Sequence, residues 1–200
     1  EIGDRTGSAL NDRAKAKIAL LGAMYGATTG ESGKLMPHLR QLFPQAIEFT
    51  EQAARIGERG GQVVTYLGRV SPSPTPEWFS RQAQQATEQD ERAARTASRS
   101  WGRFTRNFVV QGTAAEWALC WMAQIRQQLR SRKLFGQPLQ SRLVYFLHDE
   151  IMIYGPQREG QICEQIIREA AQSAGELIFG QVPVEFPVTV AITDNYSKAK

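Results

Sequence analysis

Several features that narrow the function of a protein are scarce or absent in this chain. Its 200 residues contain 2 cysteines, Cys120 and Cys163, with no CxxC spacing and no neighbouring pair of histidines. Structural zinc is therefore not expected, and a reducing, intracellular setting is the default for the thiols. The apolar runs are too short to span a bilayer, and the N-terminal stretch does not have the pattern of a signal peptide. We therefore predict a cytoplasmic protein with no membrane partner.

A strong excess of either charge is also absent. The 24 Lys and Arg residues nearly balance the 20 Asp and Glu residues, which gives a formal net charge of +4. This mildly basic balance is compatible with a polyanionic partner but does not require one. The hydrophobic content of 42% is ordinary for a globular chain. A chain of this length can bury a core as one domain or as two small lobes.

The apolar spacing predicts a mostly helical first half and a mixed second half. Residues 71–76, SPSPTP, are expected to form a loop because their prolines cannot donate backbone hydrogen bonds. Helices are expected at 13–26, 34–43, 45–60, 77–100, 107–129 and 160–179, a short β segment at 62–70, a hairpin at 142–156 and a final strand at 182–193. The predicted class is α+β, in which helices pack on a small antiparallel sheet.

The stretch RAKAKIALLGAMYG places Arg13, Lys17, Leu21 and Tyr25 at steps of four, and therefore on one broad helical face. The rise from Arg13 to Leu21 is about 12 Å, close to the extended length of a nucleoside triphosphate. Phosphates would lie over the two cations near the positive end of the helix dipole, with the base against Leu21 and Tyr25. An ordinary amphipathic helix with Leu21 and Tyr25 in the core explains the same periodicity.

A second polar stripe is formed by Arg103, Asn107 and Gln111, which are four residues apart; the last two lie in the stretch RNFVVQGTAAEW, residues 106–117. Guanidinium and amide groups suit the DNA minor groove, where every base pair offers acceptors. The alternative is a helix start at which Asn107 or Gln111 satisfies local backbone groups.

The third constellation is the stretch FLHDEIMIYGP, which predicts two strands joined by a tight turn with Asp149 at its tip. A rigid hairpin that projects one carboxylate is suited to holding a metal ion. His148 and Asp149 could instead be turn-forming residues alone.

Taken in order, the three stretches resemble the family A DNA polymerases: Lys17, Leu21, Gly22, Tyr25 and Gly26 match motif B of the fingers, QGTAA matches a palm helix, and HDE matches motif C. The family usually has an aromatic residue where this chain has Leu21. The resemblance covers about residues 12–69 and 103–200, and the Glu150 that follows Asp149 favours DNA polymerases over single-subunit RNA polymerases.

The resemblance implies template-directed DNA synthesis, in which a nucleotidyl group passes from a dNTP to a primer 3′-hydroxyl with the help of two Mg²⁺ ions. The expected partners are primer–template DNA and dNTP, and the expected state is a cytoplasmic, bacterial-type monomer. The implied roles are catalysis for Asp149, Glu150 and Lys17, metal binding for Asp149, nucleotide binding for Arg13, Lys17, Leu21 and Tyr25, and DNA binding for Tyr25, Gly26, Arg103, Asn107, Gln111 and His148.

The family's motif A aspartate, which normally precedes motif B, has no counterpart in this sequence. The expected organisation is a fingers subdomain over 1–102, with its nucleotide-binding helix at 12–26 and a polar insertion at 71–102, and the later part of a palm over 103–200. These 200 residues are therefore expected to be an inactive part of a longer polymerase. A non-catalytic nucleic-acid-binding module is the alternative, and a stand-alone helical interaction domain would make all three motifs coincidental.

The insertion carries arginines at 92, 95 and 99 that share a face with Arg103 and could follow phosphates. Pairs such as Glu88–Arg92 and Glu91–Arg95 favour an ordinary solvated surface instead.

Overall fold

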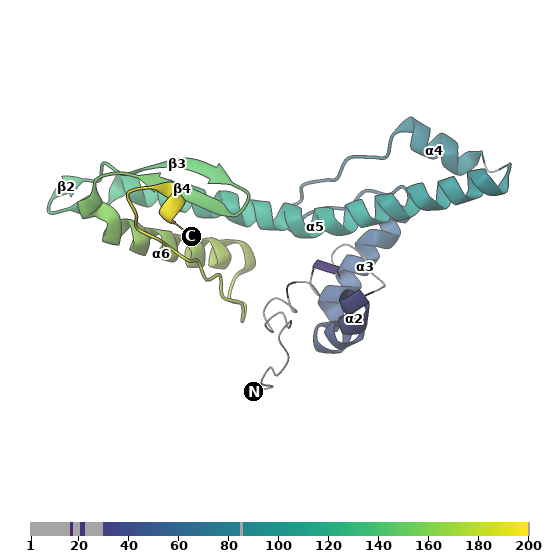
Figure 1. The fold of residues 1–200 in the computed structure, drawn as a ribbon, viewed down its shortest axis with the longest axis horizontal. Helices are drawn as coiled ribbons and strands as arrows, with labels where there is room; N and C mark the ends of the chain where they lie inside the picture. The colour runs from purple at the N-terminus through teal and green to yellow at the C-terminus, as the bar shows by residue number, and fades with distance from the viewer. Residues whose placement is uncertain (1–16, 18–20, 23–29, 85, 200) are drawn as a thin grey trace. The chain divides into compact units, whose positions relative to one another are not determined.

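A computed structural model describes Lys17, Leu21, Gly22 and residues 30–84 and 86–199 of the chain. The chain divides into two compact units, Glu1–Thr113 and Ala114–Lys200. Helices dominate, with two small antiparallel sheets, so the predicted α+β class is confirmed (Figure 1). Within the described residues, no helix combines the length and apolar character that a membrane span requires.

In the first unit, α2 (Gly30–Leu42) and α3 (Pro44–Glu58) confirm the two helices expected there. Helix α3 packs closely against a long helix, α5 (Glu88–Ser131). The Thr105 hydroxyl donates to the Ala53 carbonyl at 2.7 Å. A Cβ on Gly57 would lie 2.0 Å from the Thr105 Oγ1, so a side chain at Gly57 would separate the helices.

The segment expected to be a short β element forms one bridge, between Val64 and Val70. The buried Ser71 closes this turn, because its N–H donates to the Val63 carbonyl at 2.8 Å and its hydroxyl accepts from the Val63 N–H at 3.0 Å. The turn lies against α5, since a Cβ on Gly112 would meet the Thr65 Cγ2 at 2.4 Å.

The expectation of a single solvated helix at 77–100, separate from one at 107–129, is wrong. The chain forms α4 (Pro76–Ala83), breaks, and then enters α5, which continues without interruption to Ser131. Thr87 explains the restart: its hydroxyl accepts from the Asp90 N–H, and the Asp90 carboxylate accepts from the Thr87 N–H, a reciprocal cap.

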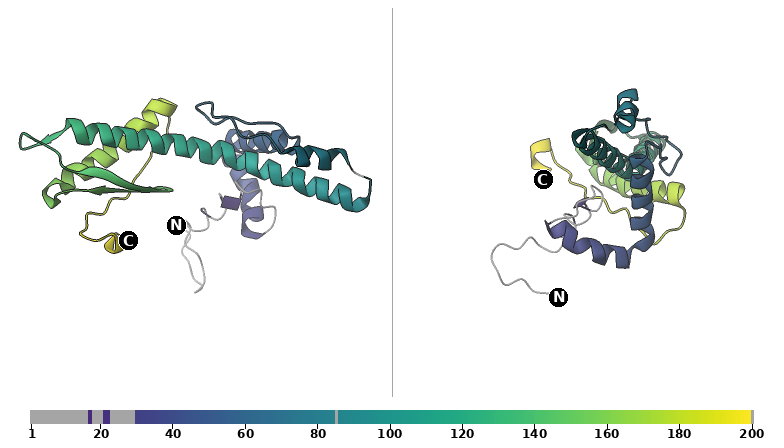
Figure 2. Two further views of the ribbon diagram at one scale, coloured as in Figure 1. Left: turned by 90° about the horizontal axis from the view of Figure 1, so that it is seen from above. Right: turned by 90° about the vertical axis from the view of Figure 1, so that its right-hand side faces the viewer.

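Helix α4 folds back along the N-terminal part of α5 (Figures 1 and 2). The Trp78 indole donates to the Ala97 carbonyl at 3.3 Å, and the Gln82 amide donates to the Ala94 carbonyl at 2.9 Å. The predicted polar insertion is therefore a helical hairpin whose apolar and amide side chains hold its two arms together.

The second unit is built on the C-terminal part of α5 and on α6 (Gly160–Phe179), which confirms the helix predicted there. Its strands are β1 (Lys133–Leu134), β2 (Gln137–Pro138), β3 (Arg142–Leu147) and β4 (Glu150–Tyr154), and two short 3₁₀ helices are η1 (Gln157–Glu159) and η2 (Tyr196–Lys198). The core joins fully buried Ile125 of α5 to fully buried Ile166 of α6.

The expected final strand at 182–193 is wrong, because no strand forms there. Pro183 and Pro187 have no N–H to donate to a ladder. The segment is held by side chains instead: the Phe186 ring stacks on Trp117 with ring centroids 5.3 Å apart.

Candidate nucleotide and DNA site

Lys17 and Leu21 are the described members of the predicted nucleotide-binding stripe. Both residues are helical, and both side chains are exposed, Leu21 to 40%. An exposed Leu21 does not fit the alternative in which it belongs to the core. Arg13, Tyr25 and Gly26 lie outside the described residues.

The polar stripe of Arg103, Asn107 and Gln111 lies in the middle of α5, so these residues do not start a helix. Arg103 and Gln111 are exposed, and the Arg103 guanidinium donates to the Ser100 hydroxyl at 2.9 Å. The Asn107 Oδ1 is buried without a hydrogen-bond partner among the described residues. In this stripe, Arg103 and Gln111 are therefore exposed, and the amide oxygen of Asn107 has no hydrogen-bond donor among the described residues.

The residues that follow Gln111 have structural contacts that the sequence did not reveal. Gly112 lets the 63–70 turn approach α5, and the Thr113 Oγ1 accepts from the Tyr66 N–H at 3.1 Å. The glycine and threonine of QGTAA thus fix a turn on one side of α5, while Gln111 remains exposed.

The β3–β4 hairpin confirms the predicted strand–turn–strand arrangement around the third motif. Leu147 pairs with Glu150, which leaves His148 and Asp149 as a two-residue loop. The φ of His148 is 54°, in the left-handed region where tight hairpin turns place their first central residue. The Asp149 side chain is exposed at this tip.

Glu150 has a partner that sequence reasoning missed. The Tyr196 hydroxyl, from η2, donates to the Glu150 carboxylate at 2.8 Å. The hydrogen bond to Glu150 and its negative charge raise the pKa of Tyr196. The neighbouring carboxylates therefore differ, because Glu150 is tied to the C-terminal segment while Asp149 has no recorded hydrogen bond or ion pair among the described residues.

A second missed residue, Glu159, anchors the base of the same hairpin. Its carboxylate is 2% exposed and accepts hydrogen bonds from the N–H of Gln140, the N–H of Ser141 at 2.9 Å and the Ser141 hydroxyl at 2.6 Å. Burial raises the pKa of Glu159, but these hydrogen bonds outweigh it, so its pKa lies below the ordinary value. The sequence carries no local signal for these contacts, because Ser141 and Glu159 are 18 residues apart.

The metal-binding capacity of the described residues is limited. Magnesium prefers several oxygen ligands in near-octahedral geometry. Asp149 supplies an exposed carboxylate of the right chemistry, but no group of three His, Cys, Asp or Glu side chains gathers anywhere in the described ranges. The hairpin therefore fits one corner of a magnesium site, not a complete one.

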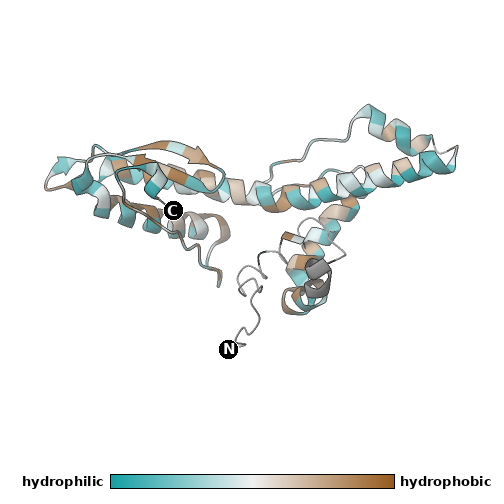
Figure 3. Ribbon diagram, in the orientation of Figure 1, coloured by the Kyte–Doolittle hydropathy of each residue, from teal (hydrophilic) through white to brown (hydrophobic). Residues whose placement is uncertain are grey.

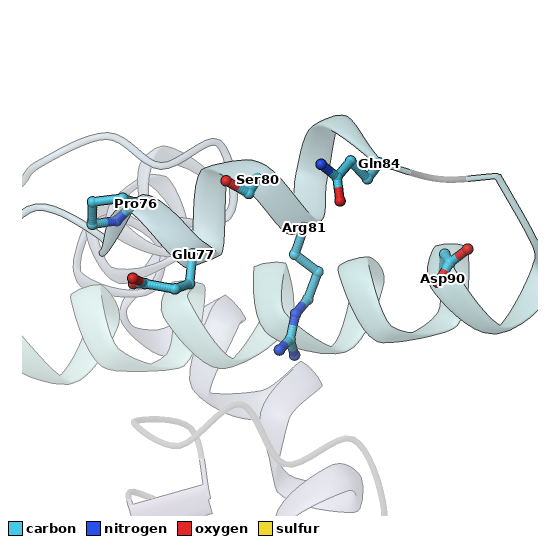
Figure 4. A pocket seen from close by; sticks show the side chains of 6 residues that line it. All are labelled: Pro76, Glu77, Ser80, Arg81, Gln84 and Asp90. Carbon is cyan, nitrogen blue, oxygen red and sulfur yellow. The ribbon is translucent and has the colours of Figure 1, made fainter.

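Two hollows of the described surface are lined by other residues. One, of about 390 Å³, lies between α4 and the start of α5 (Figure 4). Its side chains are Pro76, Glu77, Ser80, Arg81, Gln84 and Asp90. Cationic and anionic groups are mixed there, and the Asp90 carboxylate is occupied by Thr87. A second hollow lies between α6 and residues 180–188.

Two exposed polar arrays therefore stand out: a stripe on the long helix suited to a nucleic-acid groove, and a hairpin carboxylate suited to a metal-dependent reaction. Both arrays have the side-chain chemistry that nucleic-acid-binding proteins use. The family model described as DNA polymerase family A matches residues 10–198, so the chain belongs to the family A DNA polymerases. It is similar to DNA polymerase I of Chloroflexus aurantiacus, with 23% identity over 199 residues. That match covers 94% of this chain and 19% of the relative's length.

Proposed function

We propose that this chain forms the fingers and the later part of the palm of a DNA-directed DNA polymerase. The family match over residues 10–198, joined to an exposed aspartate at the tip of a two-residue hairpin turn, carries the proposal. Substrates would be dNTP and primer–template DNA, and the product would be a primer one nucleotide longer.

The residues divide into three roles. Lys17, with Arg13, neutralises the triphosphate, and Leu21 provides an apolar wall beside base and sugar. The stripe of Arg103, Asn107 and Gln111 donates hydrogen bonds to minor-groove acceptors, which occur at every base pair and permit binding without sequence preference. The stripe lies on one continuous helix, and this position supports a role in fixing the register of the bound duplex.

Asp149 would supply one carboxylate ligand to a magnesium ion, and His148, beside it in the turn, would lie near the primer terminus. Bound magnesium would activate the primer hydroxyl and stabilise the charge on the transferring phosphoryl group. Because Glu150 accepts from Tyr196, we assign it a supporting role at the hairpin. The other metal carboxylate would come from a segment outside these 200 residues, so the residues by themselves would not extend a primer.

The exposed sheet agrees with this assignment. Much of β3 and β4 is hydrophobic in sequence, as the brown colour of the ribbon in Figure 3 shows, and Val144, Phe146 and Leu147 are 42–55% exposed. Apolar residues on an open two-stranded sheet favour cover by further chain, which we propose the parent polymerase supplies.

The test is primer extension by the full-length polymerase that contains this chain. Asp149→Ala should reduce kcat by at least about a thousandfold with duplex affinity nearly unchanged, because the carboxylate serves the reaction and not the binding. Lys17→Ala should mainly raise the KM for dNTP. Glu185→Ala, which removes an exposed carboxylate outside the hairpin, is the matched control and should leave both constants unchanged.

A non-catalytic nucleic-acid-binding module is the second candidate. Leu21, where the family usually has an aromatic residue, and the missing motif A aspartate leave it open. Duplex binding by the full-length protein, with no primer extension under any divalent cation, would establish this candidate and contradict the polymerase proposal.

A further inference from the structure

A long stretch of the second unit is devoid of negative charge. Residues 117–148 include no Asp or Glu, and they contain five cationic residues, Arg126, Arg130, Arg132, Lys133 and Arg142. A one-signed stretch of this length attracts polyanions at long range.

Two of these cations are already engaged. The Arg132 guanidinium forms an ion pair with Glu169, and the Arg142 guanidinium donates to the carbonyls of Leu139 and Ser141 at 2.8 and 2.7 Å. These contacts hold the β1–β2 hairpin and the start of β3 in place, and the two residues are not available to a ligand.

The other three cations are available. Arg126, Arg130 and Lys133 are exposed, and none has an ion pair or hydrogen bond recorded within the described ranges. Arg126 and Arg130 lie one helical turn apart on the same face of α5, and Lys133 follows as the first residue of β1. They form a short cationic row that runs from the helix into the hairpin.

The β1–β2 hairpin extends past the end of α5 (Figure 2), and the pairing of Leu134 with Gln137 leaves Phe135 and Gly136 at its tip. Phe135 is 91% exposed, the largest fraction among the exposed large hydrophobic residues described. Its φ is 51° and that of Gly136 is 80°, so both central turn residues are left-handed. Asn or Gly ordinarily occupies the first such position, and a bulky residue rarely does.

Phe135 therefore neither packs in the described core nor suits its turn, and strained, exposed positions of this kind concentrate at binding sites. A row of free cations beside an exposed aromatic ring matches the recognition of single strands, in which phosphates meet cations and unpaired bases stack on aromatic faces. A duplex hides its base faces, so the ring would gain little from one.

We propose that Arg126, Arg130, Lys133 and Phe135 form a binding surface for single-stranded nucleic acid. It is separate from the duplex-binding stripe proposed on Arg103, Asn107 and Gln111, which belongs to the other compact unit. The surface does not depend on the polymerase assignment, because none of its residues takes part in the proposed reaction.

The test measures binding of the full-length protein to fluorescein-labelled dT20 and to a closed 20-base-pair duplex by fluorescence anisotropy. Phe135→Asn is the key variant, because asparagine suits the left-handed turn and should preserve or raise the melting temperature. It should still weaken dT20 binding by about threefold or more, with duplex affinity unchanged, through loss of base stacking.

Charge is tested with the triple variant Arg126→Gln, Arg130→Gln and Lys133→Gln. The slope of log affinity for dT20 against log salt should become shallower by about 2, since each phosphate contact on a single strand contributes about 0.7. Arg92→Gln removes an exposed charge that is already paired with Glu88, and this control should leave the slope unchanged.

Unchanged dT20 affinity in Phe135→Asn, or an equal loss for dT20 and duplex, would overturn the proposal. Binding of polyglutamate that is as tight as dT20 binding and is lost in the triple variant would identify an acidic protein partner instead. Asp149→Ala separates the two proposals, because it should abolish extension and leave dT20 binding intact.

Discussion

At the scale of single residues, buried polar groups hold the turns that carry the candidate site. Glu159 lies under the base of the β3–β4 hairpin and accepts from two backbone N–H groups and one hydroxyl. Thr65 does similar work in the first unit: it is 3% exposed, and its hydroxyl accepts from the Arg69 N–H at 3.0 Å. Removal of such a group leaves buried donors without a partner, which is costly.

Glu159→Gln should destabilise the folded chain by about 1–3 kcal/mol at neutral pH, because it weakens charge-assisted hydrogen bonds to a buried acceptor. The folded-state pKa of Glu159 lies below its ordinary value of 4.5, so the carboxylate contributes stability above that pH and loses it as pH falls through the folded pKa. In urea unfolding, the difference in the free energy of unfolding between the wild type and Glu159→Gln should therefore become smaller below pH 4.5. A difference that is independent of pH would contradict this account.

Gly112→Ala should destabilise the first unit by about 1–2 kcal/mol, although alanine favours helices, because the new Cβ would lie 2.4 Å from the Thr65 Cγ2. Thr65→Ser removes that methyl group and keeps the hydroxyl. In a double-mutant cycle followed by urea unfolding, the variant with both Gly112→Ala and Thr65→Ser should recover most of the free energy of unfolding that Gly112→Ala loses. Additive losses in the double variant would show that the close approach is not the cause.

At the scale of elements, α5 performs different tasks along its 44 residues. Its first turns pack under α4, its middle presents the stripe of Arg103, Asn107 and Gln111, and its last turns enter the core of the second unit. Two of the three arginines before the stripe are ion-paired: Arg92 to Glu88 at 3.2 Å and Arg95 to Glu91 at 2.9 Å. These pairs support the solvated-surface interpretation of the insertion over phosphate contact.

The double variant Arg92→Gln, Arg95→Gln should change duplex affinity of the full-length protein by less than about twofold. Exposed i,i+4 pairs stabilise a helix by only about 0.2–0.5 kcal/mol each, so the melting temperature of the protein should also change little. Anisotropy measured across a salt series is the check, with Arg103→Gln as the comparison. A salt slope reduced by about 2 would instead assign these arginines to phosphates.

At the scale of the whole molecule, the chain folds as two compact units that share one helix. Each unit has its own buried cluster: Ala53, Val63 and Val109 in the first, and residues around Ile125 and Ile166 in the second. The clusters have no residue in common. We therefore expect the two units to differ in local stability.

Ile166→Ala should lower the stability of the second unit by about 2–5 kcal/mol, because the side chain is fully buried in that unit's core. Hydrogen exchange followed by mass spectrometry should show lost protection in peptides after residue 114. Peptides from α3 should keep their protection. Loss of equal size in α3 would show that the units unfold as one.

The division of this molecule into its elements was largely readable in its sequence. Helical spacing predicted α2, α3 and α6, and two short apolar runs on either side of HDE predicted the β3–β4 hairpin, because such patterns reflect which residues each element buries. Three motifs in order also indicated the family. Local signals of this kind depend on residues a few positions apart, so they can be interpreted before the fold is known.

Tertiary structure decided the rest. Helix α4 folds back because Trp78 and Gln82 donate to carbonyls of α5, and the segment expected to be the final strand is held by the stacking of Phe186 on Trp117. The contact of Tyr196 with Glu150, 46 residues apart, follows no local rule. Such partners are chosen by the burial and pairing of distant groups, which sequence periodicity does not encode.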